Sequence, residues 1–232
     1  MKELSRIALA IEPSATMAID TMFKQMKADG LDVIGFGAGE PDFPTPDYIK
    51  EVGIKAIQNN DTKYTPSVGT VALRKAICQR LKEDCGLDYE PTQIVVASGA
   101  KHSVYIALMT LCNPGDEVVI AAPYWVSYSE MVKQAGAIPV IVAATEEADF
   151  KITAEQLDAA ITDKTKAVIP VDLGGIPCDY DRIYQAVEGK KALFCPKGDV
   201  QEALGRVAVV ADCAHGLGAS RHGVPTGALA DF

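Results

Sequence analysis

Short apolar segments typical of β-strands alternate with helical segments along the second half of the chain. The strand-like segments cover residues 117–121, 138–143 and 167–173, and the helical ones cover residues 125–134 and 153–161. Strands and helices in this alternation form a parallel sheet with helices on both faces, because each helix carries the chain back to the start of the next strand. The sequence therefore predicts an α/β fold, a three-layer sandwich around a mostly parallel sheet.

A further strand-like segment leads into a turn that suits an anion. The stretch Ile94–Leu111 predicts a strand, the small-residue turn Ser98-Gly99-Ala100-Lys101 and a helix. The backbone N–H groups at the start of that helix can close around a phosphate, with help from the helix dipole. A purely structural turn is the alternative, since α/β proteins contain many turns of this kind.

The N-terminal part of the chain predicts more helix than strand. Helices are expected from a cap at Ser14 to about residue 28, from a cap at Asp47 through residue 57, and over residues 71–85. A strand-like run covers residues 33–38. We expect irregular loops between these elements, because prolines and glycines punctuate them.

Three residues outside the regular elements are candidates for ligand contact. Gly39 lies in a Pro-rich loop with its backbone uncovered, which suits either a tight turn or a ligand. Tyr64 lies in a second such loop, where an ordinary half-buried tyrosine is the simpler interpretation. Trp125, the only tryptophan, follows a strand at the edge where open α/β sheets bind ligands. Its indole could pack in the core or stack on a planar ligand.

Charge and cysteine content argue against several classes of protein. The formal net charge is −9 and the sequence pI is about 4.8, with no cluster of basic residues, so neither nucleic acid nor a membrane surface is an expected partner. The six cysteines show no metal-ligand spacing, which favours reduced thiols, a cytoplasmic location and no metal site. No apolar run reaches the length of a signal peptide core or a membrane span.

Four segments together carry a family resemblance. They are IGFGAGEPDFPTP at 34–46, KYTPSVGTVALRKAI at 63–77, SGAKHS at 98–103 and NPGDEVVIAAPYW at 113–125. In this order they closely resemble class I aminotransferases of fold type I, the aspartate aminotransferase group, over about the first 168 residues. The resemblance implies the large domain of a pyridoxal 5'-phosphate enzyme, an amino acid and a 2-oxo acid as substrates, and a homodimer.

The resemblance also implies roles for the candidate residues. The turn from Ser98 to Lys101 matches the one that cups the cofactor phosphate. Trp125 matches the aromatic residue that stacks on the pyridine ring and borders the substrate. Tyr64 matches the tyrosine that reaches the cofactor phosphate of the neighbouring subunit, and Gly39 matches the glycine whose backbone faces the substrate carboxylate.

Beyond residue 169 the chain resembles a different branch of fold type I. The Asn-Pro-x-Gly loop of class I is absent, and residues 171–232 are similar to the sugar (DegT-like) aminotransferases, so we expect a junction near residue 169. Asp212 then matches the aspartate that pairs with the protonated pyridine nitrogen, and His215 matches the position beside the ring hydroxyl. Simpler interpretations are a helix-capping aspartate and a histidine that hydrogen-bonds the backbone.

The resemblance implies no catalytic residue in this chain, because the lysine that holds the cofactor as a Schiff base is absent. No lysine follows Lys197, and we expect the chain to end before the segment that carries it in the sugar aminotransferases. The expected organisation is an N-terminal arm and substrate loop at 1–45 and a cofactor-binding large domain at 46–232, incomplete at its C-terminus. We therefore expect this chain to be an aminotransferase with very weak activity or none.

Two other functions remain open. A non-catalytic shell that binds pyridoxal phosphate or a partner protein fits the missing lysine. A nucleotide-binding α/β domain fits the fold class, although no G-x-G-x-x-G pattern follows the first strand.

Overall fold

The computed structural model describes residues 4–37, 39, 41 and 43–232. The chain divides into two compact units, one formed by Pro13–Thr70 and the other by the segments that flank it, including Val71–Phe232. These units are defined by contacts between residues. The predicted division at residue 45 separates an arm and substrate loop from a cofactor-binding domain by function, and it stays a prediction.

The described residues of the unit Pro13–Thr70 form the helices α2 (Ala15–Ala28) and α3 (Asp47–Gln58). The Ser14 hydroxyl accepts a hydrogen bond from the Met17 backbone N–H at 3.3 Å, which confirms the predicted cap. Asp47 is the first residue of α3, and the capping position belongs to Pro46. The prediction of a capping Asp47 was therefore wrong by one residue.

The strand-like run predicted over residues 33–38 is not a strand. Residues 33–37 form no regular element, and residue 38 lies outside the described residues. The same holds for the strand predicted at the start of Ile94–Leu111, because residues 94–97 form no regular element. An apolar β-branched run becomes a strand only where a neighbouring strand offers hydrogen bonds, and neither segment has one among the described residues.

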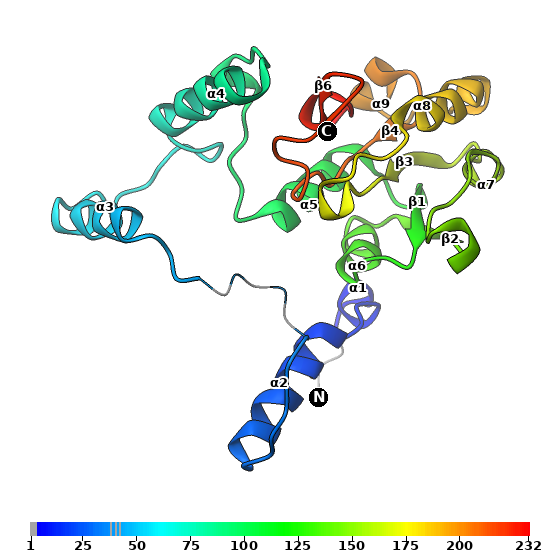
Figure 1. Ribbon diagram of the computed structural model, residues 1–232. Coiled ribbons are helices and arrows are strands. Elements are labelled where there is room, and N and C mark those ends of the chain that lie inside the picture. The colour runs from blue at the N-terminus through cyan, green and yellow to red at the C-terminus, as the bar shows by residue number, and fades with distance from the viewer. Residues whose placement is uncertain (1–3, 38, 40, 42) are drawn as a thin grey trace. The chain divides into compact units, whose positions relative to one another are not determined.

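The second unit holds the sheet and most of the helices (Figure 1). Its helices are α1 (Arg6–Leu9), α4 (Val71–Cys85), α5 (Ala100–Leu111), α6 (Ser127–Gln134), α7 (Ala154–Ala160), α8 (Tyr180–Gly189) and α9 (Asp199–Leu204). Its strands are β1 (Glu117–Ala122), β2 (Ile138–Ala143), β3 (Thr165–Ile169), β4 (Ala208–Val209) and the hairpin β5 (Ser220–Arg221) and β6 (Val224–Pro225). The predicted elements between residues 117 and 169 are confirmed, with ends that differ by a few residues. No helix of the described residues is both long and apolar enough to cross a membrane.

The main sheet has the strand order β2-β1-β3-β4, and all neighbouring strands in it are parallel. The chain leaves β1 to form β2 on one side and then returns to form β3 on the other side. Where the direction of winding reverses in this way, the loops after the two central strands diverge and leave a crevice at the carboxyl edge. The residues that follow β1 and β3 are therefore placed where an α/β protein binds its ligand.

Two hydrophobic cores cover the two faces of the sheet. Val118 and Ile120 point into one core, which contains the buried residues of α5 and α6, while Val119 points into the other, which contains those of α7 and α8. This alternation is the period of two expected of a strand that is buried on both faces. It confirms the predicted three-layer α/β sandwich around a mostly parallel sheet.

A buried carboxylate ties the start of β1 to a segment far along the chain. Asp116 is fully buried, and its oxygens accept hydrogen bonds from Lys197 Nζ at 2.8 Å and from Gln201 Nε2 at 3.0 Å. The Asn113 backbone N–H donates to the same carboxylate at 2.9 Å. Gln201 also donates to the Leu111 carbonyl at 2.6 Å, so this polar cluster joins α5, β1 and α9.

Candidate functional site

The turn before α5 presents backbone donors to solvent. Gly99 is the capping residue of α5, with φ 83° and ψ 164°, a conformation that is open essentially to glycine alone. Within the described part of the chain, the backbone N–H groups of Ala100 and Lys101 have no hydrogen-bond acceptor. The Ser98 N–H donates to His102 Nδ1 at 3.2 Å. Two open donors at the start of a twelve-residue helix make this turn suited to an anion.

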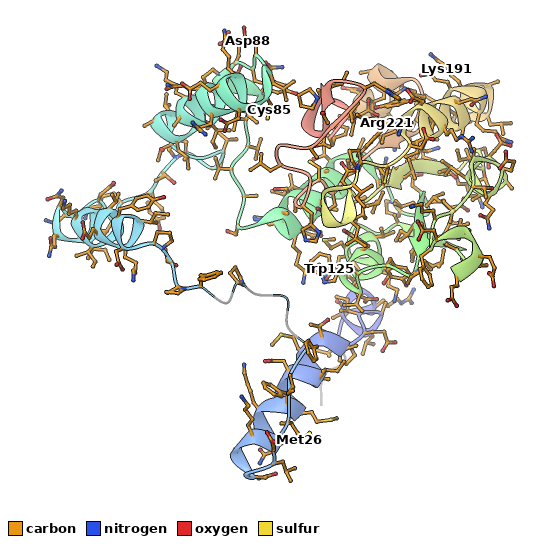
Figure 2. All side chains as sticks on the ribbon, viewed as in Figure 1. Met26, Cys85, Asp88, Trp125, Lys191 and Arg221 are labelled. Carbon is orange, nitrogen blue, oxygen red and sulfur yellow. The ribbon has the colours of Figure 1, made fainter. Side chains whose placement is uncertain are left out.

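Trp125 lies close to this turn. Its side chain projects from the loop between β1 and α6 and is 42% exposed (Figure 2). The Lys101 ammonium nitrogen lies 5.1 Å from the centre of the indole ring. The ring of Tyr128, in the first turn of α6, meets the indole nearly at right angles, with 5.4 Å between the ring centroids.

Asp212 follows β4 and is held by two hydrogen bonds. Tyr128 Oη donates to Asp212 Oδ2 at 2.7 Å, and the Ala214 backbone N–H donates to Oδ1 at 3.1 Å. Burial, and then the hydrogen bond to Asp212, raise the pKa of Tyr128 well above its usual value. Tyr128 therefore keeps its proton and acts as a donor, and Asp212 is the acceptor.

The contacts join several of the predicted site residues into one place. Lys101 contacts Trp125, Trp125 contacts Tyr128, and Tyr128 donates to Asp212. These side chains come from the first turn of α5, the loop after β1, α6 and the loop after β4. They line the carboxyl edge of the sheet, where the strand order predicts a ligand.

His215 contacts the neighbouring loop. Its Nδ1 accepts a hydrogen bond from the Gly174 backbone N–H at 3.3 Å, and the imidazole is exposed. The loops after β3 and β4 therefore lie side by side, and the backbone N–H of Asp172 also donates to the carbonyl of Asp212 at 3.0 Å. The backbone hydrogen bond that was one interpretation of His215 is present.

Sequence reasoning did not single out Tyr128 or Asp172. Asp172 is fully buried beside Asp212, and its carboxylate accepts from the Cys178 N–H at 2.8 Å and from Tyr180 Oη at 3.1 Å. Those donors make Asp172 an anchor of the loop after β3. The only sequence signal for it was a carboxylate just past a strand. Tyr128 gave no signal, because its position in α6 is that of an ordinary buried aromatic residue.

The other two predicted site residues belong to the unit Pro13–Thr70. Tyr64 is fully exposed within the described chain. Gly39 is also exposed, and a side chain added there would meet no atom within 4 Å. Among the described residues, no group of three or more His, Cys, Asp or Glu side chains is arranged to hold a metal ion.

The family is identified by comparison with known proteins. The family model "Aminotransferase class I and II" matches residues 31–171. The chain belongs to this family. Members of its aspartate aminotransferase group depend on pyridoxal 5'-phosphate.

The matching proteins are longer than this chain. It is 54% identical over 170 residues to the aspartate aminotransferase of Bacillus sp. (strain YM-2), an alignment that covers 73% of this chain and 43% of that protein. It is 50% identical over 166 residues to the aspartate/prephenate aminotransferase of Cereibacter sphaeroides, which covers 72% of this chain and 42% of that protein. The chain thus spans less than half the length of these curated relatives.

Solved structures agree with this fold. The aspartate aminotransferase of Rhizobium meliloti matches with a TM-score of 0.74 at 34% identity, over 92% of this chain and 51% of that one. The enzyme of Thermotoga maritima matches with a TM-score of 0.76 at 32% identity, over 90% of this chain and 54% of that one.

The residues present fit pyridoxal phosphate in chemical type. The cofactor offers a dianionic phosphate, a flat ring and a basic ring nitrogen. The open N–H groups of Ala100 and Lys101 suit the phosphate, the exposed indole of Trp125 suits the ring, and the half-buried carboxylate of Asp212 suits the nitrogen.

Proposed function

We propose that this aminotransferase-family chain binds pyridoxal 5'-phosphate at the carboxyl edge of its sheet, in a site built to move an amino group between an amino acid and a 2-oxo acid. The observation that carries the proposal is the Asp212 carboxylate, held by Tyr128 next to Trp125. When bound, the cofactor draws electrons away from the substrate, and it does so best with its ring nitrogen protonated. The printed names of the relatives favour aspartate as the amino donor.

Each residue of the proposed site has a separate task. The turn from Ser98 to Lys101 holds the phosphate through backbone N–H groups, and Trp125 covers one face of the ring. Asp212 holds a proton at the ring nitrogen, and Tyr128 fixes the orientation of Asp212 by donating to it. His215 lies beside the ring hydroxyl.

The second half of the proposed site comes from residues 171–232, for which we propose a relation to the sugar aminotransferases. The family match ends at residue 171, close to the expected junction near residue 169. The sheet nevertheless continues across it, because β3 pairs with β4 and Val171 forms a parallel bridge with Asp212. The two halves are thus proposed to share one cofactor.

We propose that the cofactor is held without a covalent link. Within these 232 residues no lysine follows Lys197, and the lysine whose ammonium group lies over the Trp125 ring is Lys101. Without a positioned amine to act as the base, the proton transfer of transamination is expected to be slower by about 10²–10⁴-fold. For these 232 residues by themselves we therefore propose a weak or inactive enzyme, or a non-catalytic shell that binds the cofactor.

Binding of pyridoxal phosphate to the 232-residue chain tests the proposal. We expect a weak, saturable complex that quenches Trp125 fluorescence, leaves no cofactor on any single lysine after borohydride treatment, and transaminates aspartate no faster than free cofactor. Peptide mass mapping after borohydride reads out the covalent link. Failure to bind would overturn the proposed function, and stoichiometric labelling of one lysine would overturn the non-covalent mode.

We also propose that the chain assembles as a homodimer. The unit Pro13–Thr70 exposes many large apolar side chains, among them Phe36 at 93%, Phe43 at 86% and Ile57 at 69%. Exposed apolar surface of this extent is typical of an interface between subunits. Within such a dimer, Tyr64 is proposed to reach the cofactor phosphate of the other subunit, and Gly39 to face the substrate carboxylate.

Light scattering at concentrations well above micromolar tests the dimer. We expect one discrete species at twice the monomer mass, because an interface of two-fold symmetry closes on itself. A single species at monomer mass would contradict the proposal, and so would a continuous series of larger aggregates.

The functional division and the cellular location are part of the same proposal. Residues 1–45 serve as arm and substrate loop, and residues 46–232 as cofactor domain. The structure describes all six cysteines as free thiols, which favours a reducing compartment such as the cytoplasm.

A further inference from the structure

One side chain of the candidate site contacts both the anion turn and the ring-stacking surface. Lys101 is the second residue of α5, and its backbone N–H is one of the two open donors of the turn. Its side chain reaches the other way, so that the ammonium nitrogen lies 5.1 Å from the centre of the Trp125 ring. The lysine therefore covers part of the aromatic surface that would accept a planar ligand.

The contact between Lys101 and Trp125 is the kind that an anion can displace. An ammonium group over an exposed indole is held by about 0.5–1 kcal/mol. Among the described residues, Lys101 makes no salt bridge with a carboxylate that would hold it more strongly. A phosphate at the turn would offer it a charge-assisted hydrogen bond, which is stronger. Four rotatable bonds let the ammonium move without any change of the helix backbone.

We infer that Lys101 is a specificity-determining residue that makes the ring surface favour ligands with a phosphate over those without one. Without an anion, the ammonium stays on the indole and competes with any flat ring. With an anion at the turn, the ammonium turns to the phosphate, and the indole is released for stacking. The inference rests on the proposed function, because it takes the turn as the phosphate site and Trp125 as the stacking residue.

Two ligands that differ only in the phosphate test whether Lys101 also competes with the ring on Trp125, or only attracts the phosphate by its charge. Pyridoxine and pyridoxine 5'-phosphate carry the same ring, and neither has an aldehyde that could react with lysines. Their dissociation constants are measured by the fluorescence of Trp125, the only tryptophan of the chain. The variants are Lys101→Met and the control Lys151→Met, which removes an equal charge from an exposed pair with Asp149.

The inference predicts opposite effects on the two ligands. In Lys101→Met, pyridoxine should bind about 2- to 5-fold more tightly, because the competing ammonium is gone. Pyridoxine 5'-phosphate should bind about 10-fold more weakly, because a hydrogen bond to a charged group is lost. Without ligand, acrylamide should quench Trp125 more readily in Lys101→Met than in the wild type, and Lys151→Met should change none of these values.

The outcomes distinguish the inference from the function on which it rests. If neither ligand binds to the wild type, the proposed function fails. If pyridoxine 5'-phosphate binds but pyridoxine gains nothing in Lys101→Met, Lys101 acts as a phosphate ligand only and the inference is wrong. Unchanged acrylamide quenching in Lys101→Met would also overturn it, because the ammonium would then not cover the indole.

Discussion

Replacing Asp116 with alanine should lower the free energy of unfolding by about 1–3 kcal/mol, because it removes a fully buried carboxylate and leaves the buried Gln201 amide without its acceptor. Gln201 and the Asn113 N–H would lose an acceptor in a place where water has little access. Urea unfolding at pH 7 measures the loss. The control is Asp149→Ala, which removes an exposed carboxylate and should leave the stability nearly unchanged.

The effect of Asp116 should depend on pH in a defined direction. Burial by itself would raise the pKa of Asp116, but hydrogen bonds from Lys197, Asn113 and Gln201 outweigh it, so the pKa is lowered from its usual value. A carboxyl group with a lowered pKa in the folded state stabilises the fold above the unfolded-state pKa of about 3.9. This contribution is lost as the pH falls through the folded-state pKa. The difference between wild type and variant should therefore shrink in acid, and a constant difference down to pH 3 would contradict the assignment.

Asp212→Asn should weaken the binding of pyridoxal phosphate by about 10- to 100-fold while the fold is kept. The loss corresponds to one hydrogen bond between charged groups, because a neutral amide cannot hold the ring nitrogen protonated. The fold should survive, since the asparagine oxygen can still accept from the Ala214 N–H and the amide can still contact Tyr128. Titration followed by Trp125 fluorescence gives the affinity, and urea unfolding gives the stability.

A second aspartate controls for a purely capping role of Asp212. Asp179 is the capping residue of α8, and its carboxylate accepts from the Arg182 N–H at 3.4 Å. Asparagine caps about as well as aspartate, so Asp179→Asn should leave the affinity unchanged, while the loss of its ion pair with Arg221 should lower the stability only slightly. If Asp212→Asn behaves in the same way, Asp212 is a cap and the proposed site loses its nitrogen partner.

The sequence predicted best those elements that depend on residues close to one another in the chain. The cap at Ser14, the helix over residues 71–85 and the strand over 138–143 were correct, because caps, helical spacing and short apolar runs are local signals. The strands expected over residues 33–38 and 94–97 failed for the opposite reason. A strand depends on a partner elsewhere in the chain, and no local pattern reports whether one is present.

The same limit applies to the candidate site. Lys101, Trp125 and Asp212 could be predicted because motifs carry them, and each follows a recognisable strand or opens a helix. Tyr128 could not be predicted, because its hydrogen bond to Asp212 spans 84 positions. The pairing of Asp116 with Lys197 spans 81 positions and was missed for the same reason.

The entry to α6 places two tasks within four residues. Trp125 offers the ring surface and Tyr128 holds Asp212, and the two side chains also touch each other. A mutation that shifts this short segment therefore alters the stacking surface and the orientation of the acid at once. Selection on the stacking surface therefore also acts on the hydrogen bond to Asp212. We expect relatives either to keep both Trp125 and Tyr128 or to replace the two residues together.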